Sequence, residues 1–236
     1  MQIKRIDKYL LILALILMVG SSISAQGNLP YVDDKRFHFG FSLGLGAFDF
    51  GVTPSMVSTD GKIYKVETSS LKPAFSVGII SNLRLNKYLN LRFTPTLQFG
   101  DRTLNYYSES DKSILSTDIS SIPICLPIYL KYSAERKKNY RPYVLWGGGG
   151  YLDLGRNKDK PVLLNTLDFY TEFGVGCDLY FSFFKLAPEL KFAVGFNDML
   201  TPISERTTGK TEDNKLYSTP LSKLTSRMLT LSFNFE

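Results

Sequence analysis

The sequence predicts an all-β protein, a single eight-stranded, antiparallel, up-and-down transmembrane β-barrel. Eight segments are candidate strands, and all but one alternate between apolar and polar residues with a period of two, which is the spacing of side chains along a strand and not along a helix. Most of these segments reach the roughly 9 to 11 residues that a tilted strand needs to cross a bilayer. The connections between them are alternately short and long, as in barrels of the outer membrane.

The clearest alternation lies in residues 88–102, YLNLRFTPTLQFGDR. Its odd-numbered positions from Leu89 to Phe99 are apolar, whereas its even-numbered positions, which include Arg92 and Arg102, are polar or glycine. One face of this strand therefore suits lipid, and the other suits water or paired charges.

The first two strands precede this segment. In 37–50 the odd-numbered residues from Phe37 to Leu45 form an apolar face, and Phe48 and Phe50 then change parity at Ala47, which predicts a bulge. In 71–85 the apolar face consists of Leu71, Phe75, Val77, Ile79, Leu83 and Leu85. Each strand thus presents one apolar and one polar face.

Five more strands are expected at 120–132, 140–152, 167–181, 184–196 and 227–236. Trp146 and the run Gly147–Gly150 leave the parity of 140–152 undecided, and the glycines predict a tight bend in the wall. Because proline removes a donor from the ladder, bulges are expected at Pro73, Pro95, Pro123, Pro127 and Pro188. An even number of strands returns both termini to the rim with the short turns, which is periplasmic in such barrels.

The N-terminus has the three parts of a secretory signal peptide. Lys4, Arg5 and Lys8 are basic, 9–20 is apolar, and the small residues that follow predict cleavage after Ala25. We therefore expect a signal peptide in 1–25, a short periplasmic segment in 26–36 and an outer-membrane barrel in 37–236.

The polar faces of the strands are expected to form a lumenal charge network. An eight-stranded barrel is only wide enough for side chains to fill it, so charges inside must neutralise one another. The expected members are Lys72, Arg84, Arg92, Arg102, Lys131, Asp168, Glu172, Asp178, Lys185, Glu189, Lys191 and Arg227. The basic residues gather on the second and third strands and the acidic residues on the sixth and seventh, roughly opposite. A structural salt-bridge plug follows, with ion conduction or proton transfer as the alternative.

No arrangement of residues predicts catalysis, so we expect no enzyme, no cofactor and no metal site. The sequence contains no cluster of histidines and no paired cysteines. The single histidine, His38, suits a structural hydrogen bond, with a rim serine–histidine pair as the catalytic alternative. Cys125 and Cys177 fall on opposite faces of strands that are not neighbours, which argues against a disulfide.

The expected partners follow from charge and surface. The net charge of +6 is small and dispersed, and no basic block is interleaved with aromatic residues, so nucleic acid is not an expected partner. The apolar faces would contact outer-membrane lipid and lipopolysaccharide. Beside Glu135, the residues Arg136, Lys137 and Lys138 form a candidate partner rim, for which a solvated hairpin or a lipid-headgroup contact is the alternative.

Several short motifs together resemble one family of barrel proteins. They are Asn28-Leu29-Pro30, Phe37-His38-Phe39-Gly40-Phe41-Ser42-Leu43-Gly44, Phe48-Asp49-Phe50, Ile80 to Arg84 with Leu89-Asn90-Leu91-Arg92-Phe93, Arg141-Pro142-Tyr143, Asp168-Phe169-Tyr170, Glu172 to Asp178 and Phe184 to Leu190. In order and spacing they resemble the PorT (SprT) family, outer-membrane barrels of type IX secretion and gliding motility in Bacteroidetes. The chain departs from that pattern at Trp146 and the glycines after it.

The resemblance implies a non-enzymatic accessory or assembly component of type IX secretion, in contact with other components of that machine. The lumen is too narrow to pass folded cargo, so the protein would not be the conduit. Two other interpretations remain open. One is a generic small outer-membrane barrel with a structural or adhesive role. The other is a soluble lipocalin-like barrel with its apolar face inside, against which the charged second faces and the alternating loop lengths argue.

Overall fold

Antiparallel strands form one continuous sheet in the computed structural model, which describes residues 28–55, 58–59, 62–68, 72–108, 114–154, 163–201 and 220–236. The strands are β1 (Phe37–Pro54), β2 (Ser58–Thr59), β3 (Lys62–Thr68), β4 (Lys72–Arg84), β5 (Leu89–Phe93), β6 (Thr96–Ser108), β7 (Ile114–Ser121), β8 (Pro123–Ser133), β9 (Tyr140–Asp153), β10 (Leu167–Tyr180), β11 (Lys185–Gly195) and β12 (Leu221–Phe235). A short 3-10 helix, η2 (Val32–Asp34), precedes β1. In the described ranges no helix is long and apolar enough to cross a membrane. The predicted leader in 1–25 and the predicted outward Leu71 lie outside the described residues.

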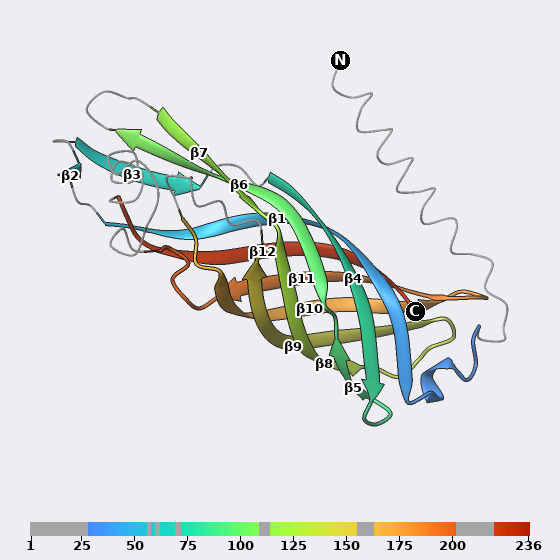
Figure 1. Ribbon diagram of the computed structural model, residues 1–236. Helices are drawn as coiled ribbons and strands as arrows, with labels where there is room; N and C mark the ends of the chain where they lie inside the picture. The colour runs from blue at the N-terminus through green and yellow to red at the C-terminus, as the bar shows by residue number, and fades with distance from the viewer. Residues whose placement is uncertain are drawn as a thin grey trace, which may run out of the picture.

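The sheet closes on itself into an eight-stranded barrel (Figure 1). Around the ring the order is β1, β12, β11, β10, β9, β8, β5 and β4, with β6 extending the position of β5 and β7 that of β8. β1 closes the ring because it pairs with β12 on one side and with β4 on the other. All neighbours are antiparallel, so the predicted all-β, up-and-down, eight-stranded fold is confirmed.

Apolar side chains cover the outside of the wall. Phe39, Ile79 and Trp146 are each more than 60% exposed, and they lie on different strands. In water such a surface would be unfavourable, whereas lipid hydrocarbon accommodates it. β9 keeps a strict alternation, with Arg141 and Tyr143 buried inside, so the parity that the sequence left undecided is that of a regular strand.

Along β1 the apolar residues change from the outward face to the inward face, although the register of the pairing does not shift. Its pairing with β12 and β4 runs continuously through Ala47, so the bulge expected there is wrong. Phe48 and Phe50 are instead buried inside the barrel, and Asp49 between them lies on the outward side. Apolar residues turn inward where the outside of the wall meets water instead of lipid.

The strands β6 and β12 show the same inversion. Asp101 and Arg227 are exposed on the outside, whereas Leu104 and Met228 are buried inside. Because charge on a lipid-facing wall is unfavourable, this level is the edge of the lipid-facing band. The predicted lumenal position of Arg227 is therefore wrong. Beyond this edge β1, β6, β7 and β12 continue and, with β3, extend past the barrel (Figure 1).

Prolines interrupt the ladder without displacing it. The register continues through Pro73, Pro95, Pro123, Pro127 and Pro188, so the bulges expected at these positions are wrong. β5 ends at Phe93 and β6 begins at Thr96, yet both pair with β4 in one register. Within a strand, alternate residues bond to each neighbour, so one proline costs one bond on one side and the flanking bonds hold the alignment. The shift in the β1–β12 pair lies between Thr53 and Pro54.

The glycine run of β9 lies in a regular strand and does not mark a bend, so the predicted bend is wrong. Gly147 to Gly150 pair in unbroken register with both β8 and β10. A Cβ on Gly149 would overlap the carbonyl oxygen of Leu126 and would lie 2.7 Å from the Cα of Pro127. Glycine is needed here because the backbones approach too closely for a side chain.

We expect Gly149→Ala to destabilise the barrel by about 1 to 3 kcal/mol, because the added methyl group overlaps backbone atoms of β8 that cannot move independently. Gly150→Ala is the matched control, since its Cβ would meet nothing closer than 4.0 Å. Denaturant unfolding in detergent, followed by the mobility difference between folded and unfolded barrel on a gel, measures both variants. Equal midpoints for the two would contradict the close-approach explanation.

Candidate functional site

Eight buried charges fill the half of the lumen near the short turns. This charge network consists of Arg92, Lys131, Lys185 and Lys191 with Glu172, Asp178, Glu189 and Glu236. Its members come from β5, β8, β10, β11 and the residue after β12, where the alternation directs them inward. Four formal positive charges face four negative ones, so the network is neutral as a whole.

Arg92 connects opposite walls of the barrel. Its Nη1 lies 3.0 Å from Glu189 Oε2, and its Nη2 lies 2.7 Å from Glu236 Oε1. All three side chains are about 2% exposed. A planar guanidinium suits two carboxylates at once, and this pairing compensates the large cost of removing the charges from water.

Lys131 and Lys185 pair with two further carboxylates of the charge network. Lys131 Nζ lies 2.8 Å from both carboxylate oxygens of Asp178, and Lys185 Nζ lies 2.7 Å from Glu236 Oε2. The Lys131 ammonium also lies 3.7 Å from the centre of the Tyr143 ring, within range of a cation–π interaction. The predicted basic and acidic residues thus meet across the lumen.

Two tyrosine hydroxyls donate hydrogen bonds to the remaining carboxylates of the charge network. Tyr143 donates a hydrogen bond of 2.7 Å to Glu189, and Tyr129 donates one to Glu172. Lys191 Nζ lies between these two carboxylates, 3.6 Å from Glu189 and 4.0 Å from Glu172. Tyr129, Tyr143 and Glu236 were not among the predicted members of the network. The inward parity of Tyr129 and Glu236 was a signal for them, whereas Tyr143 lies in 140–152, where the parity was undecided.

Arg102 and Asp168 are also buried, but farther toward the long loops. Arg102 Nη2 donates to the hydroxyls of Tyr151 and Ser226, both at 3.3 Å, and its guanidinium lies 4.5 Å from the centre of the Phe50 ring. Asp168 accepts a 2.8 Å hydrogen bond from the backbone of Phe169. These two predicted members are inside the barrel, but they lie outside the charge network.

The other predicted members lie elsewhere. Arg84 Nη1 bonds to Asp34 Oδ1 at 3.0 Å on the short-turn rim, with the Asp34 side chain 67% exposed. Lys72 is half-buried and pairs in the ladder with Phe48, toward the long loops. Arg84 and Lys72 show that the inward parity of a residue does not by itself place it in the charge network. Arg227 has the parity of the exposed Leu229, so its outward position follows the alternation of β12.

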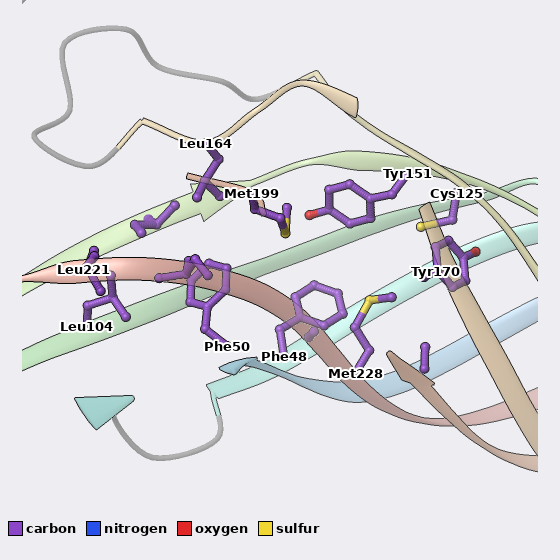
Figure 2. Packing of buried hydrophobic residues seen from close by; sticks show 14 of the residues in the cluster. Phe48, Phe50, Leu104, Cys125, Tyr151, Leu164, Tyr170, Met199, Leu221 and Met228 are labelled. Atoms are coloured by element: carbon purple, nitrogen blue, oxygen red, sulfur yellow. The ribbon is translucent and has the colours of Figure 1, made fainter. Parts of the chain in front are cut away.

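Around Arg102 and Asp168, the half of the lumen near the long loops is mainly apolar (Figure 2). The apolar cluster there includes Phe48, Phe50, Leu104, Tyr151, Leu164, Tyr170, Met199, Leu221, Leu224 and Met228, all buried. Figure 2 shows the rings of Phe48 and Phe50 between the strands, with Met199 and Met228 nearby. The interior is therefore packed with ion pairs at one end and with hydrophobic side chains at the other.

Residues 28–36 form a strap at the short-turn rim. Asn28 bonds to the side chain of Asn139 and the carbonyl of Tyr180, and Asp33 accepts hydrogen bonds of 2.9 and 2.8 Å from the Tyr180 hydroxyl. The Val32 carbonyl, in the middle of the strap, lies 2.6 Å from Nε2 of His38 on β1, and at the end of the strap the Arg36 carbonyl accepts a 2.9 Å hydrogen bond from Arg84 N on β4. β1 lies opposite β9 in the ring, so the strap crosses the mouth of the barrel.

The candidate partner rim has two kinds of residue. Arg136 holds the strap: its guanidinium donates to the carbonyls of Leu29 and Asn28 and lies 3.7 Å from Asp33. Lys137 and Lys138 are exposed, and Lys138 has a positive φ of 54°. Of the three predicted contact residues, the two lysines therefore present their side chains to solvent.

Beside this turn, an exposed pair joins two short connections. Lys87 Nζ bonds to Glu135 Oε1 at 2.7 Å, and Tyr88 donates a 3.1 Å hydrogen bond to the same oxygen. The bond to Glu135 raises the pKa of Lys87, and the bond to Lys87 lowers the pKa of Glu135. Both shifts favour the charged forms that a lysine and a glutamate already have at neutral pH, and because solvent screens the pair its contribution to stability is small.

Cys125 and Cys177 are free thiols, the first buried and the second half-buried. They lie on β8 and β10, which β9 separates in the ring. In the described part of the chain, no group of three or more His, Cys, Asp or Glu side chains is arranged to hold a metal ion.

Comparison with known proteins gives a family and a fold. A family model described as outer membrane protein beta-barrel domain matches residues 24–201, from before the strap through β11. Neisserial surface protein A (NspA) is a similar solved structure, 10% identical in sequence, with 85% of this chain and 98% of that chain covered and a TM-score of 0.42. Outer membrane protein AlkL, determined in DMPC bilayers, is 13% identical, with coverages of 90% and 93% and a TM-score of 0.43. No curated protein matches the chain.

We expect Arg92→Met to destabilise the barrel by about 3 to 5 kcal/mol, because Glu189 and Glu236 would keep buried charges without their shared cation. Adding Glu236→Gln to Arg92→Met should recover part of the loss, since it removes one of the uncompensated charges. Unfolding midpoints in detergent measure both. A double variant no more stable than the single one would contradict this assignment.

We expect Asp33→Asn to loosen the strap, because it removes the charge that Arg136 and Arg141 face at 3.7 Å. Hydrogen–deuterium exchange of peptides from 28–36 should become faster, with exchange in β10 and β11 unchanged. Lys35→Gln is the control, since Lys35 is exposed and should leave the exchange as in the wild type. Equal exchange in wild type and Asp33→Asn would show that these contacts do not hold the strap.

Proposed function

Because the chain belongs to the outer membrane protein beta-barrel domain family, we propose that it is a closed, non-enzymatic barrel with a structural or adhesive role in the outer membrane. The observation that carries this proposal is the packed interior. Arg92 ties β5 to β11 and the end of β12 through the middle of the lumen, with its partners about 2% exposed. A barrel of this width with its lumen so occupied suits a scaffold better than a conduit.

The sheet beyond the lipid-facing band supports an adhesive role. Its outer surface carries charge at Asp101 and Arg227, and its inner side is apolar at Leu104 and Met228, as in a water-soluble sheet. In the orientation common to these barrels, with short turns in the periplasm, this sheet stands outside the cell. We infer that the chain has its termini in the periplasm after export, that its wall contacts lipid and lipopolysaccharide, and that the protruding strands meet external partners.

A role as an accessory of type IX secretion is the second candidate. The feature that favours it is the strap, because the motif Asn28-Leu29-Pro30 and His38, which carry the resemblance to the PorT family, are residues that build or anchor it. A segment fixed across the periplasmic mouth, beside the exposed Lys137 and Lys138, offers a rigid surface to other components of a secretion machine.

Deletion of the gene with two readouts separates the candidates. For a structural or adhesive barrel, we expect export of cargo with C-terminal sorting domains to be unchanged, while sensitivity to detergents rises or surface attachment falls. Both defects should disappear on complementation. Cargo that accumulates in the periplasm of the deletion strain, and not in the complemented strain, would overturn the structural proposal in favour of type IX secretion.

A further inference from the structure

A pocket of about 400 Å³ lies on the short-turn rim, between the strap and the turn that joins β4 to β5. Three basic residues, Arg36, Arg84 and Lys87, line it together with one acidic residue, Asp34. The lining therefore has an excess of two formal positive charges. A site of this charge suits an anion.

The three basic side chains of the pocket differ in whether they already have an ion-pair partner. Arg84 is bound to Asp34 at 3.0 Å, and Lys87 is bound to Glu135 at 2.7 Å. Arg36 is exposed, and its side chain has no ion-pair or hydrogen-bond partner among the residues that the structure describes. Its backbone is nevertheless fixed, because its carbonyl accepts a 2.9 Å hydrogen bond from Arg84 N. Arg36 thus presents a free guanidinium from a fixed position, which is the arrangement for binding phosphate oxygens.

The other side of the pocket is apolar and continuous with the lipid-facing wall. Leu83 and Leu85 line it, and Leu85 is 51% exposed. In the ladder Leu83 is paired with Phe37, which is 57% exposed on the outside. A molecule with its anionic group at Arg36 would therefore lay a hydrocarbon chain against Phe37, Leu83 and Leu85.

We propose that this pocket binds the phosphodiester headgroup of an anionic membrane glycerophospholipid, with its acyl chain on the adjoining outer wall. The charge of the lining selects an anionic headgroup, and the two leucines select a lipid over a free phosphate ion. Such a lipid would join the strap to the bilayer surface at the rim. This inference rests on the barrel's place in the outer membrane and not on its role there.

Native mass spectrometry of the full-length exported protein in detergent tests the proposal. The probes are phosphatidylglycerol and phosphatidylcholine with the same acyl chains, and inorganic phosphate. We expect phosphatidylglycerol to bind about fivefold more tightly than phosphatidylcholine, and Arg36→Gln to remove that preference, as loss of one charge-assisted contact would. Lys35→Gln is the matched control: it removes the same charge from the neighbouring exposed position outside the pocket lining, and the preference should persist.

Three results would overturn the assignment. Equal binding of the two lipids would show that the pocket does not select an anionic headgroup. Equal losses in Arg36→Gln and Lys35→Gln would show a general effect of charge instead of a site. The third result is displacement of the lipid by inorganic phosphate at the same concentration at which lipid saturates the protein. It would identify the ligand as free phosphate. Gel mobility of each variant confirms that the barrel is folded, so none of these results depends on misfolding.

Discussion

Closure of the ladder by β1 is the constraint on which the rest of the structure depends. In hydrocarbon every backbone donor and acceptor must be paired, so a sheet with a free edge is excluded. β1 satisfies this by pairing with β12 along one side and β4 along the other. Closure also fixes the width of the lumen, and this width brings Arg92 on β5 within bonding distance of Glu189 on β11.

Along the same strands, the outer surface of the wall first faces lipid and then faces water. Next to lipid, apolar residues such as Phe39 point outward and charges are packed inside; beyond the band, Asp101 points outward and Leu104 inward. The interior follows the same division, from the charge network to the apolar cluster. One backbone geometry thus serves both regions, because only the choice of side chains on each face changes.

Much of this arrangement was predictable from the sequence, because the period of two survives wherever one face meets lipid. The alternation in segments such as 88–102 predicted the strands and placed Arg92 on the polar face, although this one segment forms both β5 and the start of β6. Phe48 and Phe50 were misassigned because an inverted alternation and a bulge have the same sequence pattern, and only the ladder distinguishes them. Which inward charges meet depends on how the strands are offset from one another along the barrel. The pattern of a single strand does not show this offset, so the separation of Arg102 from the charge network could not be predicted. The strap was equally beyond it, since its contacts lie more than a hundred residues away.

The charge network links the electrostatics of the lumen to the order in which the barrel assembles. Arg92 and Glu236 are separated by 144 residues, and Lys185 reaches Glu236 only when β12 is in place. Until then two cations would enter hydrocarbon with part of their compensation missing, at high cost. Partly closed intermediates are therefore poor occupants of the bilayer, which couples the insertion of the strands to closure of the ring.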